Sequence, residues 1–238
     1  MRVTTAGMLI ALAGLAMAAP VPKENVKKLE DVFGEVADPK SDCKFDMMKG
    51  DALRITVPKG HPPTDFSDDH PARPPMVAKV VEGDFVLTVR VTHTPAKDAG
   101  RAAGAKGNTE VMAGISLYAE DDPKRSLLFT QRHIWNGQSW VSGFTRESRG
   151  GGSSTGSNSP LDDERGKAVY LKLTRNGGDF KTATSTDGKT WDDFLNCSIE
   201  KLGAKLVVGP VALHNTSDDY EAVFDQYEIK PLAKDEKK

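Results

Sequence analysis

Five stretches of the chain alternate between apolar side chains and other types. Over 85–92, every second residue from Phe85 onward is a large apolar one, and the residues between them include Thr88 and Arg90. Successive side chains of a β-strand point to opposite faces, so this period of two predicts strands with one buried and one solvated face. The same pattern recurs over 53–57, 169–174, 207–214 and 222–229. In the last stretch it places Val223, Asp225, Tyr227 and Ile229 on one face.

Turn sequences that contain glycine separate these stretches. They are Lys49-Gly50-Asp51, Glu82-Gly83-Asp84, Asn176-Gly177-Gly178 and Asp187-Gly188. Glycine adopts the positive φ angles of tight turns without a steric cost, so each sequence favours a reversal of the chain. Short strands joined by turns, without strand–helix alternation, predict an all-β sandwich or barrel.

The helical pattern in the chain is confined to the polar segment 20–40. There Leu29 and its apolar neighbours have helical spacing, and Gly34 can end the helix. We expect a short surface helix in this segment, a β-sandwich domain over 41–231 and a charged tail over 232–238. Three irregular segments rich in Pro, Gly, Ser or charge predict long loops, at 58–75, 95–109 and 146–166.

The first nineteen residues have the features of a secretory signal peptide. Arg2 supplies a positive charge, the run from Met8 to Ala18 is apolar, and small residues surround Ala19. The run is too short to span a hydrocarbon core of about 30 Å as a helix. We therefore expect cleavage of residues 1–19, a secreted or periplasmic mature chain and no membrane span.

Charge and cysteine content narrow the function classes further. The 32 basic and 34 acidic residues nearly cancel, which argues against a nucleic-acid partner held by a general positive field. The chain has two cysteines, Cys43 and Cys197. In an exported protein they form a candidate disulfide, and two unpaired cysteines buried as small hydrophobic residues are the alternative. Neither has the neighbouring Cys or His residues in sequence that a zinc site uses.

Four segments together resemble a known family. They are VEGDFVLTVRV (81–91), MAGISLYAEDD (112–122), VYLKLTRNGGDFKTATSTDGKTW (169–191) and VGPVALHNTSDDYEAVFDQYEI (208–229). The series is similar to the concanavalin A-like lectin/glucanase jelly-roll family, including the β-sandwich appended to some β-xylosidases and laminin-G-like modules. The resemblance implies two curved antiparallel sheets that bind ligands on the concave face or at the rim loops. Within it, 185–191 resembles a single Asp-box hairpin of sialidases, in which we expect Trp191 to be structural.

The sequence does not contain the catalytic pattern of this family. Its enzymes resemble one another in an E-x-D-x-x-E strand whose carboxylates do the chemistry. The nearest match here begins at Glu82-Gly83-Asp84 and lacks the second glutamate. The segment 152–156 matches G-x-S-x-G formally, but it lies in a Gly/Ser run without the strand and helix of a nucleophile elbow. We expect no catalytic residues.

A carbohydrate site is predicted around two tryptophans. Sugar rings stack on exposed aromatic faces, and planar polar side chains bind their hydroxyls. The candidate residues are Tyr118, Arg132, Trp135, Asn136 and Trp140. Packing of the tryptophans in the protein interior is the alternative. Arg54, Arg90, Lys172 and His214 on the polar strand faces favour an acidic ligand, or are simply solvated.

Two segments are candidate metal sites. Asp225 matches the acidic residue near the last strand that ligates a structural Ca²⁺ in several related sandwiches, so the resemblance implies either that ion or an Arg partner for a half-buried carboxylate. The segment 61–70 contains His61, Asp65, Asp68, Asp69 and His70, without the spacing of a defined metal site. A solvated loop is the alternative there.

Three hypotheses for function follow. The first is a secreted, non-catalytic module that binds a polysaccharide or another cell-surface glycan. The second is a structural or interaction protein of the cell envelope without a sugar ligand. The third is a glycoside hydrolase of the same fold. A glycan panel separates the first two, and hydrolysis of polysaccharides tests the third.

Overall fold

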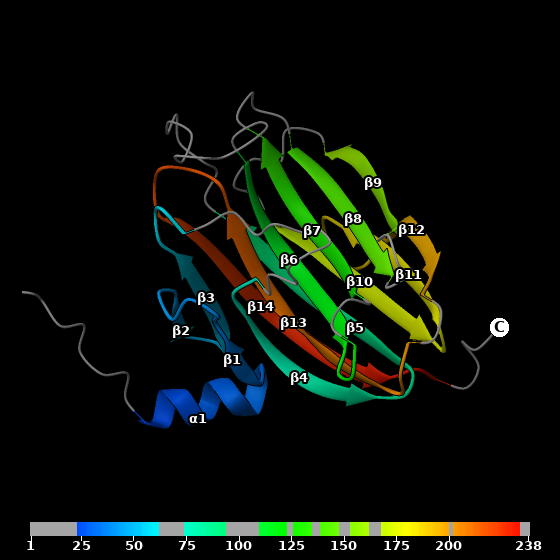
Figure 1. The fold of residues 1–238 in the computed structure, drawn as a ribbon, viewed down its shortest axis with the longest axis horizontal. Coiled ribbons are helices and arrows are strands. Elements are labelled where there is room, and N and C mark those ends of the chain that lie inside the picture. The colour runs from blue at the N-terminus through cyan, green and yellow to red at the C-terminus, as the bar shows by residue number, and fades with distance from the viewer. Residues whose placement is uncertain are drawn as a thin grey trace, which may run out of the picture.

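The protein is a jelly-roll β-sandwich of two seven-stranded antiparallel sheets (Figure 1). The computed structural model describes residues 23–61, 74–93, 110–122, 126–134, 139–147, 153–161, 168–199 and 202–233. Sheet A contains, in spatial order, β1 (Glu35–Ala37), β4 (Met76–Glu82), β13 (Lys205–His214), β6 (Glu110–Ala119), β7 (Ser126–Ile134), β8 (Ser139–Glu147) and β9 (Ser153–Leu161). Sheet B contains β12 (Asp192–Ser198), β11 (Asp179–Ser185), β10 (Val169–Asn176), β5 (Phe85–His93), β14 (Tyr220–Pro231), β3 (Ala52–Val57) and β2 (Lys44–Met48).

The main hydrophobic core lies between the two sheets and follows the predicted alternation. In β5, the side chains from Phe85 to Val91 at every second position are buried, and the residues between them are half-buried. In β10, the same holds for Val169, Leu171 and Leu173. Burial of one such side chain is worth about 1.5–3 kcal/mol, so the alternation determines which face of each strand turns inward. All five predicted strand stretches and all four predicted turns are present.

The segment 20–40 is integrated into the sandwich more closely than predicted. It forms α1 (Lys23–Val32) and β1, and β1 pairs with β4 in sheet A. Phe33 is fully buried in the main core and stacks on Tyr227 with ring centroids 5.0 Å apart. Gly34 ends the helix at φ 106°, and a Cβ there would lie 2.0 Å from the Ala78 carbonyl oxygen. The helix was predicted correctly, but its description as a surface adjunct is wrong.

Part of the predicted loop at 146–166 is a strand. β9 pairs with β8 along its whole length, from Glu147 opposite Ser153 to Ser139 opposite Leu161. This strand is at the edge of sheet A and consists mostly of Ser, Thr, Gly and Asn. Such a composition has no apolar alternation, so the sequence pattern missed a strand that backbone pairing defines.

A β-bulge in β14 changes the predicted phase of that strand. The register with β5 shifts between Asp225 and Glu228, and Gln226 has a positive φ of 50°. Val223 and Asp225 therefore share the outer face of sheet B, whereas Tyr227 packs against the main core. The prediction that Tyr227 lies on the face of Asp225 is wrong, because one extra residue inverts the alternation.

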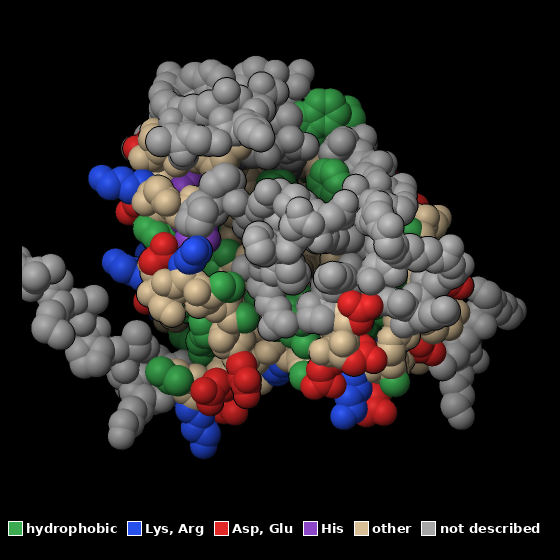
Figure 2. Space-filling model, in the orientation of Figure 1, with side chains coloured by type: hydrophobic (Ala, Val, Ile, Leu, Met, Phe, Trp, Pro, Cys, Tyr) green, Lys and Arg blue, Asp and Glu red, His purple; other side chains and the backbone are tan. Residues whose placement is uncertain are grey.

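The surface is consistent with the balanced charge of the sequence. In Figure 2, acidic and basic side chains are interspersed along the lower rim, below β4 and around α1. Among the described residues, no helix is long and apolar enough to cross a bilayer.

Candidate functional site

The predicted aromatic site is only partly within the described residues. Trp135 and Asn136 lie outside them, and Arg132 is described by its backbone, which pairs with Trp140 and Met112. Trp140 is half-buried on β8, and its indole Nε1 has no hydrogen-bond acceptor among the described residues. The stacking role of Trp135 and Trp140 stays a prediction.

Tyr118 does not present an open ring face. It is 8% exposed and belongs to a second apolar cluster, which lies on the face of sheet A that turns away from the core. Neighbours in this cluster include Leu128, Val211 and Leu213. Their chain neighbours Leu117, Leu127 and Ala212 point into the main core, which shows that the two clusters lie on opposite faces. Tyr118 is therefore a packing residue, and its assignment to the sugar site is corrected.

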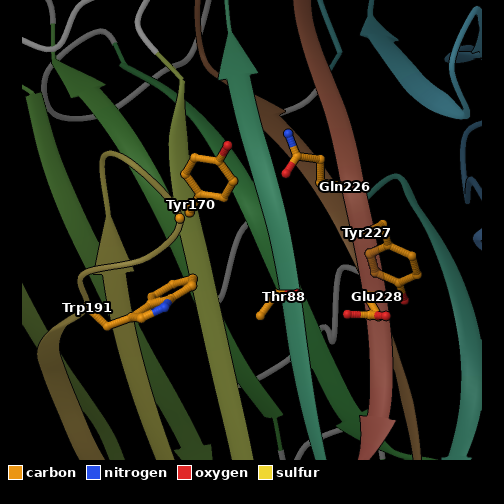
Figure 3. Close-up of a pocket in the computed structure, with 7 residues that line it drawn as sticks. Thr88, Tyr170, Trp191, Gln226, Tyr227 and Glu228 are labelled. Carbon is orange, nitrogen blue, oxygen red and sulfur yellow. The ribbon is translucent and has the colours of Figure 1, made fainter.

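An open groove lies instead on the outer face of sheet B. Its volume is about 370 Å³. The lining residues come from three neighbouring strands and one hairpin and are Thr88, Tyr170, Gly188, Trp191, Gln226, Tyr227 and Glu228. Figure 3 shows Tyr170 and Trp191 on one side, Gln226 and Glu228 on the other, and Thr88 between them. We call this cavity the sheet B groove.

Strand register brings these side chains together. Thr88 of β5 lies opposite Lys172 of β10 and opposite Glu228 of β14. Two residues further along β5, Arg90 lies opposite Tyr170 on one side and Asp225 on the other. Because residues two apart share a face, these two rows form one continuous polar and aromatic surface. The bulge at Gln226 lies at the edge of this surface.

The β11–β12 hairpin holds Trp191 at the groove. The Asp187 carboxylate accepts hydrogen bonds from the backbone N–H groups of Lys189 and Thr190, both at 2.8 Å, and from the Ser185 hydroxyl at 2.9 Å. The two N–H groups are the main reason that the pKa of Asp187 is lowered to about 2. The predicted Asp-box-like hairpin is therefore present, and Oδ1 of its carboxylate accepts hydrogen bonds within the turn.

Both aromatic rings have fixed neighbours. The Lys172 ammonium lies over the Trp191 ring, 4.3 Å from its centroid, in a cation–π contact. A Cβ on Gly188 would lie 2.9 Å from the Tyr170 ring, so this ring packs directly against the glycine of the turn. Trp191 and Tyr170 are both half-buried. Trp191 was predicted to be purely structural, but it also lines a cavity.

Two arginines beyond the groove, Arg90 and Arg54, are paired with carboxylates. Arg90 Nε lies 3.2 Å from Asp225 Oδ1, and Arg54 Nη2 lies 3.0 Å from Asp46 Oδ2. Of the two partners left open for Asp225, the structure shows the arginine. A guanidinium this close to the carboxylate repels a divalent cation, so the residues around Asp225 do not fit a Ca²⁺ site.

His214 is not part of the polar outer face. It is 3% exposed, its Nε2 donates to the Pro58 carbonyl at 3.1 Å, and its Nδ1 accepts from the backbone N–H of Thr216. Burial lowers its pKa and favours the neutral ring. The prediction that His214 contributes to an acidic-ligand surface is wrong.

The two cysteines do not form a disulfide in the structure. Cys197 lies on β12 at one edge of sheet B, and Cys43 directly precedes β2 at the opposite edge. Adjacent strands are about 4.8 Å apart, whereas a disulfide needs Cα atoms within about 7 Å. The candidate bridge is therefore incompatible with the fold.

The segments that resemble catalytic motifs have structural roles. Glu82-Gly83-Asp84 forms the β4–β5 turn, where Asp84 Oδ1 accepts from the Gly177 N–H at 2.7 Å. Ser154 of the G-x-S-x-G match lies within β9 rather than at a turn between a strand and a helix. Neither segment has the local geometry of the catalytic motif that it resembles.

Comparison with known proteins places the chain in a fold class. The class is the jelly-roll β-sandwich that also occurs in several carbohydrate-active proteins. No protein-family model matches the sequence, and no curated protein matches it.

Solved structures share this fold at low sequence identity. A functionally unknown protein from Saccharomyces cerevisiae has a TM-score of 0.61 at 15% identity, over 84% of this chain and 97% of the yeast chain. The GH43 protein BlXynB from Bacillus licheniformis has a TM-score of 0.57 at 15% identity, over 82% of this chain and 36% of its own. An alginate lyase from Klebsiella pneumoniae has a TM-score of 0.54 at 9% identity, over 79% of this chain and 84% of the lyase. The chain thus spans about a third of BlXynB, and these similarities show the fold alone.

Proposed function

We propose that the protein is a secreted, non-catalytic module that binds a polysaccharide or cell-surface glycan in the sheet B groove. The observation that carries this proposal is a cavity of about 370 Å³ in which Tyr170 and Trp191 lie opposite Gln226 and Glu228. A sugar ring presents an apolar C–H face and a rim of hydroxyls, and this groove offers aromatic groups for the one and polar groups for the other.

The size of the groove supports a short glycan segment. Small-molecule sites commonly measure about 300–1,000 Å³, and the groove is at the lower end of that range. Its open form suits a site along a polymer rather than an enclosed pocket for a free metabolite. Lys172 and Glu228 lie on either side of Thr88 with opposite charges, so the groove does not select strongly for an anionic ligand.

The arrangement of carboxylates supports binding over hydrolysis. Glycoside hydrolases use two carboxyl groups on either side of the scissile bond. Glu228 is the one carboxylate among the seven residues that line the groove, and Asp225 nearby is paired with Arg90. Secretion rests on the signal peptide predicted at 1–19, outside the described residues.

The test is a glycan panel with the purified mature chain. The panel includes xylan and alginate, because structural neighbours include a xylan β-1,4-xylosidase and an alginate lyase. We expect saturable binding to at least one polysaccharide without release of reducing sugar. Absence of binding across neutral and acidic glycans favours the envelope-interaction alternative, and turnover favours the hydrolase.

Glu228→Gln tests the groove within that experiment. Loss of the charge weakens a hydrogen bond from a sugar hydroxyl, and charge-assisted bonds are worth about 1.5–3 kcal/mol. We expect affinity to fall about tenfold or more. Glu221→Gln, an exposed glutamate of the same strand outside the groove, is the matched control and should bind as the wild type does. Equal affinities for the two variants would place the ligand elsewhere.

A further inference from the structure

Three potential metal ligands meet at the edge of sheet B. Asp42 and Cys43 directly precede β2, and His61 follows β3 after a short turn. The β2–β3 pairing, with Lys44 opposite Thr56, brings these two parts of the chain together. A hydrogen bond from the backbone N–H of His61 to the Pro58 carbonyl, at 3.1 Å, stabilises the turn.

The ligand atoms converge on a small volume. His61 Nδ1 lies 2.9 Å from Asp42 Oδ1 and 3.9 Å from Cys43 Sγ, and Sγ lies 3.5 Å from the same Asp42 oxygen. With the usual Zn–S, Zn–N and Zn–O distances, a tetrahedral zinc ion has ligand atoms about 3.4–3.6 Å apart. Each of the three distances is therefore within about half an ångström of the separation that zinc requires.

The surroundings of this cluster favour a cation. His61 is 7% exposed and Cys43 is half-buried, so both side chains are already held in place. The Asp38 carboxylate accepts from the Cys43 N–H at 2.9 Å, which adds a second negative charge near the sulfur. Burial, together with Asp38 and Asp42, raises the pKa of the Cys43 thiol. The raised pKa favours the protonated thiol, and a bound metal ion reverses this preference because it stabilises the thiolate.

The geometry does not suit a nucleophilic cysteine. In a catalytic Cys–His–Asp arrangement, the thiol and the carboxylate contact different nitrogens of the imidazole. Here Sγ and Asp42 Oδ1 both approach Nδ1. The convergence of three donors on one point is the arrangement of ligands around an ion.

We propose that Asp42, Cys43 and His61 form a zinc site with three protein ligands and a fourth position open to water or another donor. On binding, the Cys43 thiol releases its proton to solvent. His61 binds as the neutral ring through Nδ1 and keeps its proton on Nε2. The ion would link the turn after β3 to the start of β2 and so stabilise this edge of sheet B. The sequence singled out His61 as a candidate ligand but not Asp42 or Cys43, because the hairpin brings together residues 18 positions apart.

Cobalt titration of the full mature chain, freed of metal by chelation, tests the proposal. A cobalt–thiolate bond gives a charge-transfer band in the near ultraviolet. We expect the band to saturate at one ion per chain and to disappear when Zn²⁺ is added. Cys43→Ser and His61→Gln should abolish it. The matched control, Cys197→Ser, removes the other cysteine and should retain it.

Thiol protection provides a second measurement on the unmodified protein. Zn²⁺ should slow alkylation of Cys43 by at least tenfold and leave Cys197 unaffected, with both sites measured by peptide mass spectrometry in the same sample. This readout does not depend on the folding of a variant. The proposal is overturned if the wild type gives no thiolate–cobalt band at a molar excess of Co²⁺, if Cys43→Ser keeps the band, or if Zn²⁺ protects both cysteines equally.

Discussion

Arg175 shows how a single buried side chain can organise several turns. It is 4% exposed and donates to four backbone carbonyls, those of Gly177, Gly83, Ala204 and Gly203, at 2.7–3.1 Å. These carbonyls belong to three separate turns at one end of the sandwich. A charged group is tolerated there because its donors are satisfied.

Replacement of Arg175 by Met should therefore destabilise the fold strongly. Each hydrogen bond contributes about 1 kcal/mol net, and four carbonyls lose the Arg175 donors, so we expect a loss of about 3 kcal/mol in chemical denaturation. The control is Arg54→Met, which breaks a half-exposed pair with Asp46 and should cost no more than about 1 kcal/mol. Similar losses for the two variants would contradict this role of Arg175.

The lowered pKa of Asp187 should make the stability of the fold depend on pH in a defined way. Its pKa is lowered to about 2, chiefly by hydrogen bonds from the N–H groups of Thr190 and Lys189. A carboxylate with a lowered folded pKa stabilises the fold above its unfolded pKa of about 3.9, and this stabilisation is lost as the pH falls through about 2. Wild type should thus melt at a higher temperature than Asp187→Asn at neutral pH, and the gap should close between about pH 4 and pH 2.

Thermal melts of both proteins across this range measure the effect. Asp193→Asn removes one charge from the adjoining strand β12 and controls for the change in net charge. A difference between wild type and Asp187→Asn that persists undiminished to about pH 2 would show that the carboxylate does not act through ionisation.

The N-terminal elements belong to the sandwich as structural parts. α1 presents Leu29 to the main core, Phe33 at its end is fully buried, and β1 extends sheet A by one strand. Phe33 also covers Tyr227, the residue that follows the bulge in β14. The N-terminal segment thus supports the strand that supplies Gln226 and Glu228 to the groove.

Phe33→Ala should destabilise the domain by about 3–5 kcal/mol, the usual cost of truncating a buried aromatic. Equilibrium denaturation followed by tryptophan fluorescence measures it. Val36→Ala, at a residue of β1 that is 45% exposed, is the control and should change stability by less than about 0.5 kcal/mol. If Phe33→Ala is as stable as this control, the N-terminal segment is the adjunct that its sequence suggested.

For the whole molecule, the fold could be predicted from the sequence far better than the site. Alternation in segments such as 85–92 reflects the burial of one strand face, and this is a local property of the sequence. β9 escaped prediction because an edge strand of small polar residues is defined by pairing with β8. The sheet B groove escaped because Thr88, Trp191 and Glu228 are far apart in sequence and meet only through the order of the strands.

The choice of a glycan site also depends on how the strands are arranged in the whole fold. Two tryptophans close in sequence suggested a sugar site at Trp135 and Trp140, while the Asp-box-like hairpin suggested that Trp191 was structural. The structure adds that Trp191 lines an open cavity together with Tyr170. Proximity in the chain suggested the one site, and proximity across strands suggests the other.

The central claim is that the sheet B groove binds glycan, and calorimetric titration of two tryptophan variants tests it most directly. The titrant is the polysaccharide with the largest response in the glycan panel, and circular dichroism verifies that both variants are folded. Trp191→Ala should weaken binding by about 1–3 kcal/mol, or roughly 5–150-fold, as expected for loss of a central aromatic contact. Trp140→Ala, on the other sheet, should keep the affinity of the wild type. Unchanged binding by folded Trp191→Ala, together with loss of binding in Trp140→Ala, would contradict glycan binding in the sheet B groove. It would indicate a site at Trp140 on sheet A.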